Sequence, residues 1–360
     1  MRGRVDPQES MFSYFSPESR VPAGHPLRQI KQHADTVLRS MNAEFDRLYA
    51  ETGRPSIPPE RLLKASLLIA LYSVRSDRLF CEMLDYNMLF RWFLDMSLEQ
   101  SGLDQSNFSR LRERLVEQDT ARVFFDAVVG EARRADLLSD EHFTVDGTLI
   151  EAWASLKSFK PKDGPPSAGG GSDGMVDFRG QRRSNDTHQS TTDDEARLAR
   201  KGKGKEAKLC YGGHALMENR NGLCVDLAVR SMQQTETEAT KEILARQGRK
   251  RVRPATLGAD KGYHTKDFVA HLRRRGIAPH IAQIEGRNTP GLDARTTRHA
   301  GYAISQRKRK RVEEIFGWMK TYGGLRRTLV RGLARVQMHA YIVGAAYNLL
   351  RMSRLDPATG

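Results

Sequence analysis

Hydrophobic residues recur at helical spacing through the first third of the chain. The clearest run follows Pro59 and contains Leu62, Leu63, Ala65, Leu67, Leu68 and Leu71. A further run rich in Leu, Phe and Met covers residues 79–96, and Ser106 stands where the N-cap of a helix through Leu115 is expected. These patterns predict an all-helical region over residues 1–138.

The pattern changes after residue 141. Short β-prone runs now alternate with helical patterns, and Gly222 marks a turn between two of the runs. The predicted strands cover residues 142–145, 209–217, 223–229, 255–259 and 278–281. The predicted helices cover residues 235–247, 266–275, 309–320 and 336–350. This order of elements predicts a mixed α/β sheet within residues 139–352.

The predicted helix over residues 309–320 carries the most informative pattern. Its apolar residues Val312, Ile315, Phe316 and Met319 have the spacing of a buried stripe. At about 100° per residue, Arg309, Glu313 and Lys320 share one ridge beside that stripe, whereas Glu314 falls on the far side. A carboxylate between two cations can hold a metal ion against a phosphate, which makes further carboxylates worth finding.

Residues 157–208 are low in complexity. The segment contains Pro165-Pro166, a glycine triplet at 169–171 and a basic Lys-Gly repeat at 201–205. It holds too few apolar residues to fold alone, so we expect a mobile loop inserted into the sheet region. A passive linker and a loop that orders on a polyanion are both compatible with this composition.

The charge of the chain is unevenly distributed. The formal net charge is +15, but residues 1–140 carry 19 Lys and Arg against 21 Asp and Glu, so residues 141–360 carry a balance of +17. A positive field concentrated on one region favours a polyanion, most simply nucleic acid. A protein with basic loops and no such partner is the alternative that charge alone leaves open.

The cysteines and the hydropathy of the chain indicate the cellular compartment in which the protein is expected. The three cysteines are an odd number without C-x-x-C spacing, which fits a reducing compartment and argues against a thiolate zinc site. The first 26 residues lack the apolar run of a signal peptide, and no later run has the length of a membrane span. We therefore expect a soluble, cytoplasmic protein with no membrane partner.

Two aspartates follow predicted strands. Asp146 comes after Phe143-Thr144-Val145 and before Gly147, and Asp260 comes after residues 257–259 and two residues before Gly262. Strand ends are rigid mounts for carboxylates, and hard oxygen donors are the ligands of Mg²⁺. Taken alone, each acid is better explained as a turn or cap residue than as a metal ligand.

Together these motifs resemble those of the DDE transposases of bacterial insertion sequences, most closely the insertion sequence 5 group. The resemblance runs from about Pro26 to Arg351. It is carried by Val145-Asp146-Gly147-Thr148, by residues 208–214, by Ala259-Asp260-Lys261-Gly262-Tyr263, and by Arg309, Glu313 and Lys320 at the spacing of the family's last motif. Gln306 occupies the position of that motif's tyrosine, and the nearest tyrosine is Tyr302.

The resemblance implies a fold, an activity and a site. The expected fold is an RNase H-like mixed-sheet catalytic domain, residues 139–352, after an all-α domain, residues 1–138, that binds DNA ends or dimerises. Asp146, Asp260 and Glu313 would bind two Mg²⁺ ions, which Mn²⁺ can replace. The implied reaction is cut-and-paste transposition: hydrolytic cleavage at terminal inverted repeats, then transfer of the 3′-OH to target DNA. The implied protein is bacterial, associated with the nucleoid, and a homodimer on DNA.

The expected DNA contacts are basic residues near the acids. Arg309 and Lys320 would grip phosphates beside the scissile bond. The remaining expected contacts are Lys261, Tyr263, Arg307, Arg311, Arg326 and Arg327. Structural or DNA-facing roles are favoured for His214 and His264 because Mg²⁺ prefers oxygen, and packing is favoured over base stacking for Trp318.

Two alternatives of other classes remain. One is a domesticated DNA-binding protein without catalysis, which the presence of all three acids and both cations argues against. The other is an RNase H-like nuclease or Holliday-junction resolvase, which the helical region and the basic insert fit less well.

Overall fold

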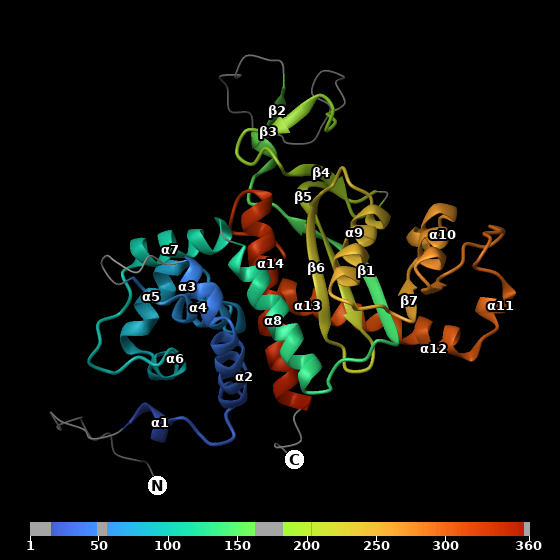
Figure 1. Cartoon of the computed structure of the whole chain (residues 1–360). Helices are drawn as coiled ribbons and strands as arrows, with labels where there is room; N and C mark the ends of the chain where they lie inside the picture. Colours follow the sequence, from blue (N-terminus) through green and yellow to red (C-terminus); the bar gives the residue numbers. More distant parts are fainter. Residues whose placement is uncertain (1–15, 49–55, 118, 163–182, 203, 356–360) are drawn as a thin grey trace, which may run out of the picture.

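The computed structural model describes residues 16–48, 56–117, 119–162, 183–202 and 204–355. A helical N-terminal part lies beside a mixed sheet, and a small outlying group of helices lies beyond the sheet's other edge (Figure 1). No helix in these described ranges is long and apolar enough to cross a membrane.

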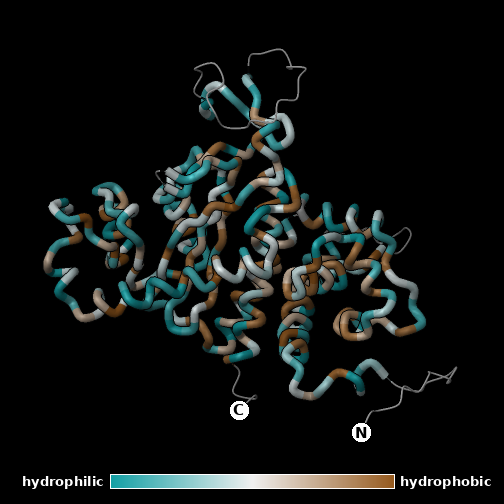
Figure 2. The backbone as a smooth tube through the Cα atoms, turned by 180° about the vertical axis from the view of Figure 1, so that it is seen from behind, coloured by the Kyte–Doolittle hydropathy of each residue, from teal (hydrophilic) through white to brown (hydrophobic). Residues whose placement is uncertain are grey.

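The N-terminal part is helical throughout its described residues. Its helices are α1 (Pro17–Arg20), α2 (Leu27–Ser40), α3 (Asn42–Leu48), α4 (Pro59–Leu71), α5 (Asp77–Tyr86), α6 (Met88–Phe93), α7 (Gln105–Glu117) and α8 (Thr120–Arg134). Hydrophobic and hydrophilic positions alternate along them, as amphipathic packing requires (Figure 2).

One local expectation in this part needs correction, and one is refined. The run over residues 79–96 forms two helices, because Asn87 ends α5 and its side chain accepts a hydrogen bond from the Phe90 amide that opens α6. Helix α7 starts earlier than expected. Asp104, and not Ser106, accepts from the Asn107 amide at 2.8 Å, and the Ser106 hydroxyl donates to the same carboxylate.

The sheet has the strand order of the RNase H-like fold, so the predicted fold class is confirmed. Its strands are β1 (His142–Glu151), β4 (Arg197–Arg200), β5 (Ala207–Glu218), β6 (Cys224–Ser231), β7 (Thr256–Ala259) and β8 (Ala278–Ile281). The central path is β6-β5-β1-β7-β8, antiparallel from β6 to β1 and parallel from β1 to β8. β4 pairs with the first residues of β5, on the side that β6 occupies further along.

The segment expected as a loop, residues 157–208, is partly ordered. It contains the 3₁₀ turn η1 (Leu156–Ser158), the hairpin strands β2 (Phe159–Pro161) and β3 (His188–Ser190), and β4. The Phe159 ring stacks on His188, and Ser158 and Ser190 share a buried hydrogen bond. Ordering here needs little apolar area because hydrogen bonds to itself and to β5 satisfy the backbone. The proline pair and the glycine triplet lie outside the described residues.

The helices after β6 surround the sheet. They are α9 (Glu236–Arg249), η2 (Lys261–Tyr263), α10 (Lys266–Arg274), α11 (Ala294–Thr297), α12 (Ala300–Lys308), η3 (Arg309–Arg311), α13 (Val312–Thr321) and α14 (Leu333–Leu355). The α-helix expected from Arg309 begins only at Val312, and the residues before it form a 3₁₀ turn. Three consecutive cations at a helix N-terminus oppose the macrodipole, which disfavours extending α13 toward them. The predicted buried stripe of α13 is confirmed.

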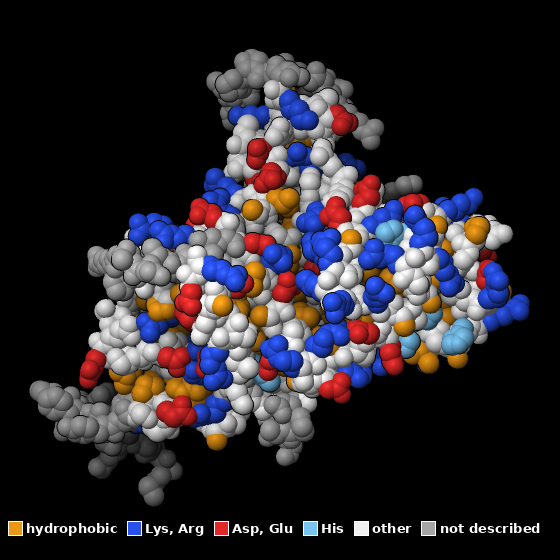
Figure 3. Space-filling view, in the orientation of Figure 1, with side chains coloured by type: hydrophobic (Ala, Val, Ile, Leu, Met, Phe, Trp, Pro, Cys, Tyr) orange, Lys and Arg blue, Asp and Glu red, His pale blue; other side chains and the backbone are white. Residues whose placement is uncertain are grey.

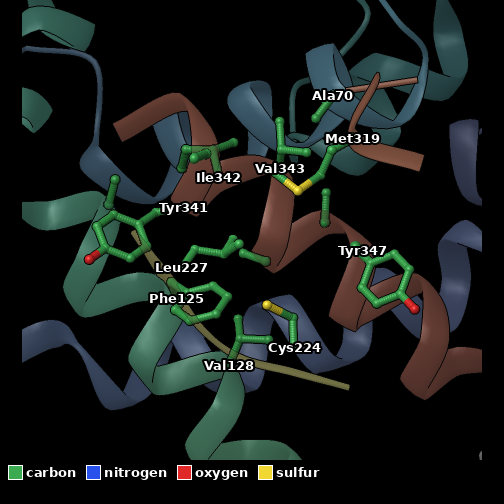
Figure 4. Packing of buried hydrophobic residues seen from close by; sticks show 14 of the residues in the cluster. Ala70, Phe125, Val128, Cys224, Leu227, Met319, Tyr341, Ile342, Val343 and Tyr347 are labelled. Carbon is green, nitrogen blue, oxygen red and sulfur yellow. The ribbon is translucent and has the colours of Figure 1, made fainter. Parts of the chain in front are cut away.

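Helix α14 joins the two parts of the chain. It packs against α8, α4 and α2 on one side and against β6 and α13 on the other. Figure 4 shows Phe125 of α8 and Leu227 of β6 meeting α14. A Cβ added to Gly344 of α14 would lie 2.4 Å from Leu227 and 2.9 Å from Phe125, so only glycine allows this approach. Because one core spans both parts, a division into domains at residue 138 stays a prediction.

Candidate active site

The sequence suggested that Asp146 follows the end of a strand. In the structure it lies inside β1 instead. The strand continues to Glu151 because its antiparallel neighbour β5 pairs along its whole length, with Ala215 opposite Asp146. The parallel neighbour β7 is shorter, and its last pair with β1 is Thr144 with Gly258. Asp146 and Asp260 each lie two residues beyond that pair. The two aspartates therefore stand at the same level of adjacent strands.

Side chains alternate along β1, so the two faces of the sheet receive different groups near Asp146. Thr148, on the face of Asp146, accepts a hydrogen bond of 2.5 Å from Lys320 of α13. Gly147 points to the opposite face, where an added Cβ would lie 2.8 Å from Glu236 at the start of α9. Helix α13 is therefore on the Asp146 face and α9 on the other.

Glu313 reaches the same region from α13. It precedes Lys320 by seven residues, which returns it to nearly the same side of the helix. Glu314 points away and forms an ion pair of 3.0 Å with Arg351 of α14. The distinction drawn between the two glutamates from helical geometry agrees with this placement.

The three acids share one electrostatic environment. Burial raises the pKa of Asp146, and the negative charges of Asp260 and Glu313 raise it further. The Gly147 amide, which donates to Asp146 at 2.8 Å, and the Arg309 guanidinium oppose that shift. The carboxylates therefore repel one another, and the Arg309 side chain partly counters this repulsion at Asp146.

The residues present fit a divalent cation held by pairs of carboxylates. Among the described residues, no three His, Cys, Asp or Glu side chains converge closely enough to hold one ion together. Mg²⁺ does not require this, because it is usually bound by one or two carboxylates together with waters and phosphate oxygens. The donor atoms are carboxylate oxygens, and their mutual repulsion is what such an ion relieves.

Several of the basic residues predicted to contact DNA lie near the acids or are exposed. The Arg309 Nε is buried without a hydrogen-bond partner, and its charge acts on Asp146. Burial lowers the pKa of Lys320, and the nearby charges of Lys201 and Arg326 lower it further. Three other cations, Lys261, Arg307 and Arg326, are exposed. Over α9 and α10, Lys and Arg side chains gather densely on one face of the molecule (Figure 3).

Other predicted contacts are engaged within the protein. Tyr263 is fully buried with its ring against Phe268, so it is a core residue and not a surface for DNA. Arg311 donates to the carbonyls of Asn219 and Arg220 in the turn between β5 and β6. Arg327 lies over the Trp153 ring and donates to its carbonyl at 3.0 Å.

The histidines and aromatic residues noted in the sequence have structural partners, with one exception. His264 accepts a hydrogen bond from the Ile284 amide at 2.9 Å, and Trp318 packs on the Tyr347 ring. His214 is 4% exposed, but its Nδ1 has no hydrogen-bond partner. Burial lowers the pKa of His214 to about 4, so the ring is neutral near pH 7.

Gln306, where the resembled motif has a tyrosine, anchors helix α12 to the sheet. Its amide donates to the His280 carbonyl of β8. One turn earlier, the Tyr302 hydroxyl donates to the Ile281 carbonyl at 2.7 Å. Both side chains therefore hold α12, and with it Arg309, against β8.

The sequence patterns did not identify Glu236, whose carboxylate lies beside Gly147, after Asp146, and near Gly262, after Asp260. Burial raises its pKa, and the charges of Asp260 and Asp146 raise it further. The capping box formed by Thr235 and Glu238 marks the start of α9 and is visible in the sequence. That signal places Glu236 in the first turn after the short connection from β6, but it does not say which strand the turn faces.

Comparison with known proteins identifies two matching family models. The model described as Transposase DDE domain matches residues 140–349, and the model described as Transposase domain (DUF772) matches residues 15–114. None of the curated proteins compared with the chain matches its sequence significantly.

Similarity to solved structures is weak. A piggyBac transposase synaptic complex with hairpin DNA has 12% identity and a TM-score of 0.40, with 91% of this chain and 75% of that chain covered. A pre-cleavage Mos1 transpososome has 10% identity and a TM-score of 0.20, with coverages of 88% and 87%. A Mos1 paired-end complex with the left transposon end has 12% identity and a TM-score of 0.21, with coverages of 88% and 85%.

Proposed function

We propose that this chain, which belongs to the family of transposases with a DDE domain, catalyses metal-dependent cut-and-paste DNA transposition. The reaction consists of hydrolytic strand cleavage at terminal inverted repeats, followed by transfer of the freed 3′-OH to target DNA. The observation that carries the proposal is the placement of Asp146 and Asp260 at one level of adjacent strands, with Glu313 acting on the same carboxylate. The insertion sequence 5 group is the proposed branch of the family.

The three acids are the proposed metal ligands. Asp146, Asp260 and Glu313 would hold two Mg²⁺ ions, or Mn²⁺ in their place. Bound there, the ions would activate the attacking water or 3′-OH and stabilise the leaving 3′ oxygen. The protein contributes rigid mounts, since Asp146 lies inside β1, where it pairs with Ala215 of β5, and Glu313 is on a helix with a buried stripe.

Two cations would orient the scissile phosphate. Arg309 has an unpartnered buried Nε beside Asp146, and its planar guanidinium suits bidentate phosphate contact. Lys320 is held in place by its hydrogen bond to Thr148, two residues after Asp146. A phosphate that accepts from both would therefore lie over the acids rather than along the outer surface of α13.

Double-stranded DNA is the proposed partner, as transposon ends and as target. The exposed cations Lys261, Arg307 and Arg326 would contact backbone phosphates outside the acids. The helical N-terminal part, matched by a transposase domain model of its own, would bind the ends. We propose a homodimer in the DNA-bound state, because two ends must be cut and joined together.

An excision assay tests this proposal. The substrate is a supercoiled plasmid that carries the DNA segments flanking the reading frame of this chain. A marker gene stands between these segments in place of the reading frame. With the purified full chain and Mg²⁺, we expect excised marker and joined target products, and none in EDTA. Asp146→Asn, Asp260→Asn and Glu313→Gln should each reduce excision by on the order of 10³-fold or more while retaining DNA binding in a mobility-shift assay.

Three outcomes would overturn the proposal. Undiminished cleavage by Asp146→Asn would remove the metal assignment. Cleavage without joining would favour an RNase H-like nuclease. Binding of the flanking DNA without cleavage in Mg²⁺ or Mn²⁺ would favour a domesticated DNA-binding protein.

A further inference from the structure

Glu236 is not needed for the local structure of its helix. It is the first residue of α9, a helix of 14 residues whose N-cap is Thr235. The capping box uses Glu238, whose carboxylate accepts from the Thr235 amide at 2.9 Å. Glu236 is a neighbour of this box, and its carboxylate points elsewhere. The hydrogen bonds of the cap therefore do not require Glu236. Its negative charge in the first turn favours the helix dipole, and its carboxylate contacts lie outside the helix.

The Glu236 carboxylate lies against the backbone that follows each of the two aspartates. Its Oε1 is 2.8 Å from the point where a Cβ on Gly147 would stand. Its Oε2 is 3.7 Å from the equivalent point on Gly262, and the Asp260 Oδ1 is 3.1 Å from that same point. Two glycines, one after each aspartate, thus leave the space that lets a third side chain enter from the α9 face.

A second polar group points into the same space. The Nδ1 of the buried His214, on β5, lies 3.2 Å from the Gly147 Cβ position and has no hydrogen-bond partner. Buried polar atoms in native proteins are nearly always paired, with protein, water or a ligand. An orphaned ring nitrogen beside an acid is therefore a place where a bound hydrated group would supply the missing partner. The neutral His214 ring does not itself neutralise Glu236.

Among the residues that the structure describes, no cationic side chain pairs with Glu236. Placing a carboxylate near two others without a partner is unfavourable through repulsion. Divalent cations bound between pairs of these carboxylates would compensate their charge.

We propose that Glu236 is a fourth carboxylate of the metal site, reaching it from α9 past Gly147 while Glu313 reaches it from α13. The proposal rests on the proposed function, because it uses the site that Asp146 and Asp260 form. Glu236 would serve the ion on the Asp260 side, directly or through a water that His214 also contacts.

Metal binding by the full chain without DNA tests the proposal. Mn²⁺ is titrated by calorimetry into the wild type and into Glu236→Gln, Glu238→Gln and Asp146→Asn. We expect Glu236→Gln to weaken Mn²⁺ binding by about tenfold or more. Glu238→Gln, in the same turn, should bind as the wild type does because its carboxylate faces solvent at the cap and glutamine also completes a capping box.

A folding control and a second variant keep the test decisive. In EDTA, Glu236→Gln should melt at or above the wild-type temperature, since it removes an uncompensated charge, and its gain in melting temperature on adding Mn²⁺ should be smaller. Gly147→Ala keeps every charge but places a methyl group 2.8 Å from the Glu236 Oε1, so it should also weaken Mn²⁺ binding.

The outcomes separate this inference from the function on which it rests. Wild-type affinity in Glu236→Gln, together with lost binding in Asp146→Asn, would overturn the role of Glu236 alone. Wild-type affinity in both variants would overturn the metal site of the proposed function as well.

Discussion

Lys320 of α13 donates a hydrogen bond of 2.5 Å to the hydroxyl of Thr148, two residues after Asp146 on β1. This contact fixes one side of α13 against the strand that bears the first acid. Glu313 is two helical turns before Lys320 on nearly the same side, so the contact also sets how Glu313 faces Asp146. The third acid is thus positioned by the protein before any metal binds.

Removing this hydrogen bond while keeping all charges should impair catalysis more than folding. Thr148→Val keeps the shape of the side chain but leaves Lys320 without its acceptor. We expect the rate of excision to fall by roughly tenfold, because Lys320 and Glu313 lose a fixed orientation. Thermal unfolding should change little. An unchanged excision rate would mean that packing of the buried stripe alone positions α13.

The two adjacent glutamates of α13 should respond in opposite ways to the same substitution. Glu313→Gln removes an acid that acts on Asp146, and we expect it to abolish excision. Glu314→Gln loses only the partly exposed ion pair with Arg351, which contributes about 0–1 kcal/mol to stability, so excision should persist. Loss of excision in Glu314→Gln would contradict the geometry of α13 described above.

The burial of Tyr263 gives a prediction that differs from the one its sequence position suggests. Tyr263→Phe should leave DNA affinity and excision within about twofold of the wild type, because the hydroxyl is inside the protein and cannot contact DNA. Tyr263→Ala should instead lower the free energy of unfolding by about 3–5 kcal/mol through a core cavity. Mobility-shift titration and urea unfolding measure the two effects. A Tyr263→Phe variant that folds but loses DNA affinity would show that the ring is accessible.

The acid cluster should make the metal-free protein less stable as pH rises. Burial first, and then the charges of Asp260 and Glu313, raise the pKa of Asp146 in the folded state. When the pKa of an acid is higher in the folded state than in the unfolded state, the folded protein binds more protons. The stability that Asp146 contributes at low pH is therefore lost as the pH rises from about 4, its pKa in the unfolded chain, through its raised pKa in the folded protein.

Asp146→Asn isolates this effect in EDTA. Its free energy of unfolding should exceed that of the wild type near pH 7, and the difference should shrink as the pH falls toward 4. Urea unfolding at a series of pH values measures it. A difference that is constant with pH would mean that the Asp146 carboxylate is not destabilised by its neighbours.

The sequence predicted which strands and helices form the site better than it predicted where each of them begins and ends. All five strands and the buried stripe of α13 were recognisable because both depend on local periodicity. The position of Asp146 inside β1 was not recognisable from the sequence, because the length of a strand depends on the strand with which it pairs, here β5. Tyr263 illustrates the same limit, because a residue after a catalytic motif looks exposed until α10 is packed over it.

Glu236 could not be found by spacing at all. It is 90 residues from Asp146, and its approach requires two glycines that lack side chains for reasons that the sequence does not display. Local signals identify the turn in which it lies, whereas the identity of its neighbours is a property of the assembled sheet.

The basic residues near the acids should differ in their contribution to DNA binding according to their partners in the protein. Arg326 is exposed, and its charge acts on Lys320, so it lies where a phosphate beside the acids would be. Arg335 is also basic and exposed, but it forms an ion pair of 2.7 Å with Glu113 of α7. Each phosphate contact releases counterions, so removing one should reduce the slope of log affinity against log salt by about 0.9. We expect Arg326→Ala to show this reduction and Arg335→Ala to keep the wild-type slope, measured by titration of transposon-end DNA at several salt concentrations. Equal slopes in Arg326→Ala and the wild type would place the DNA away from the α13 face of the sheet.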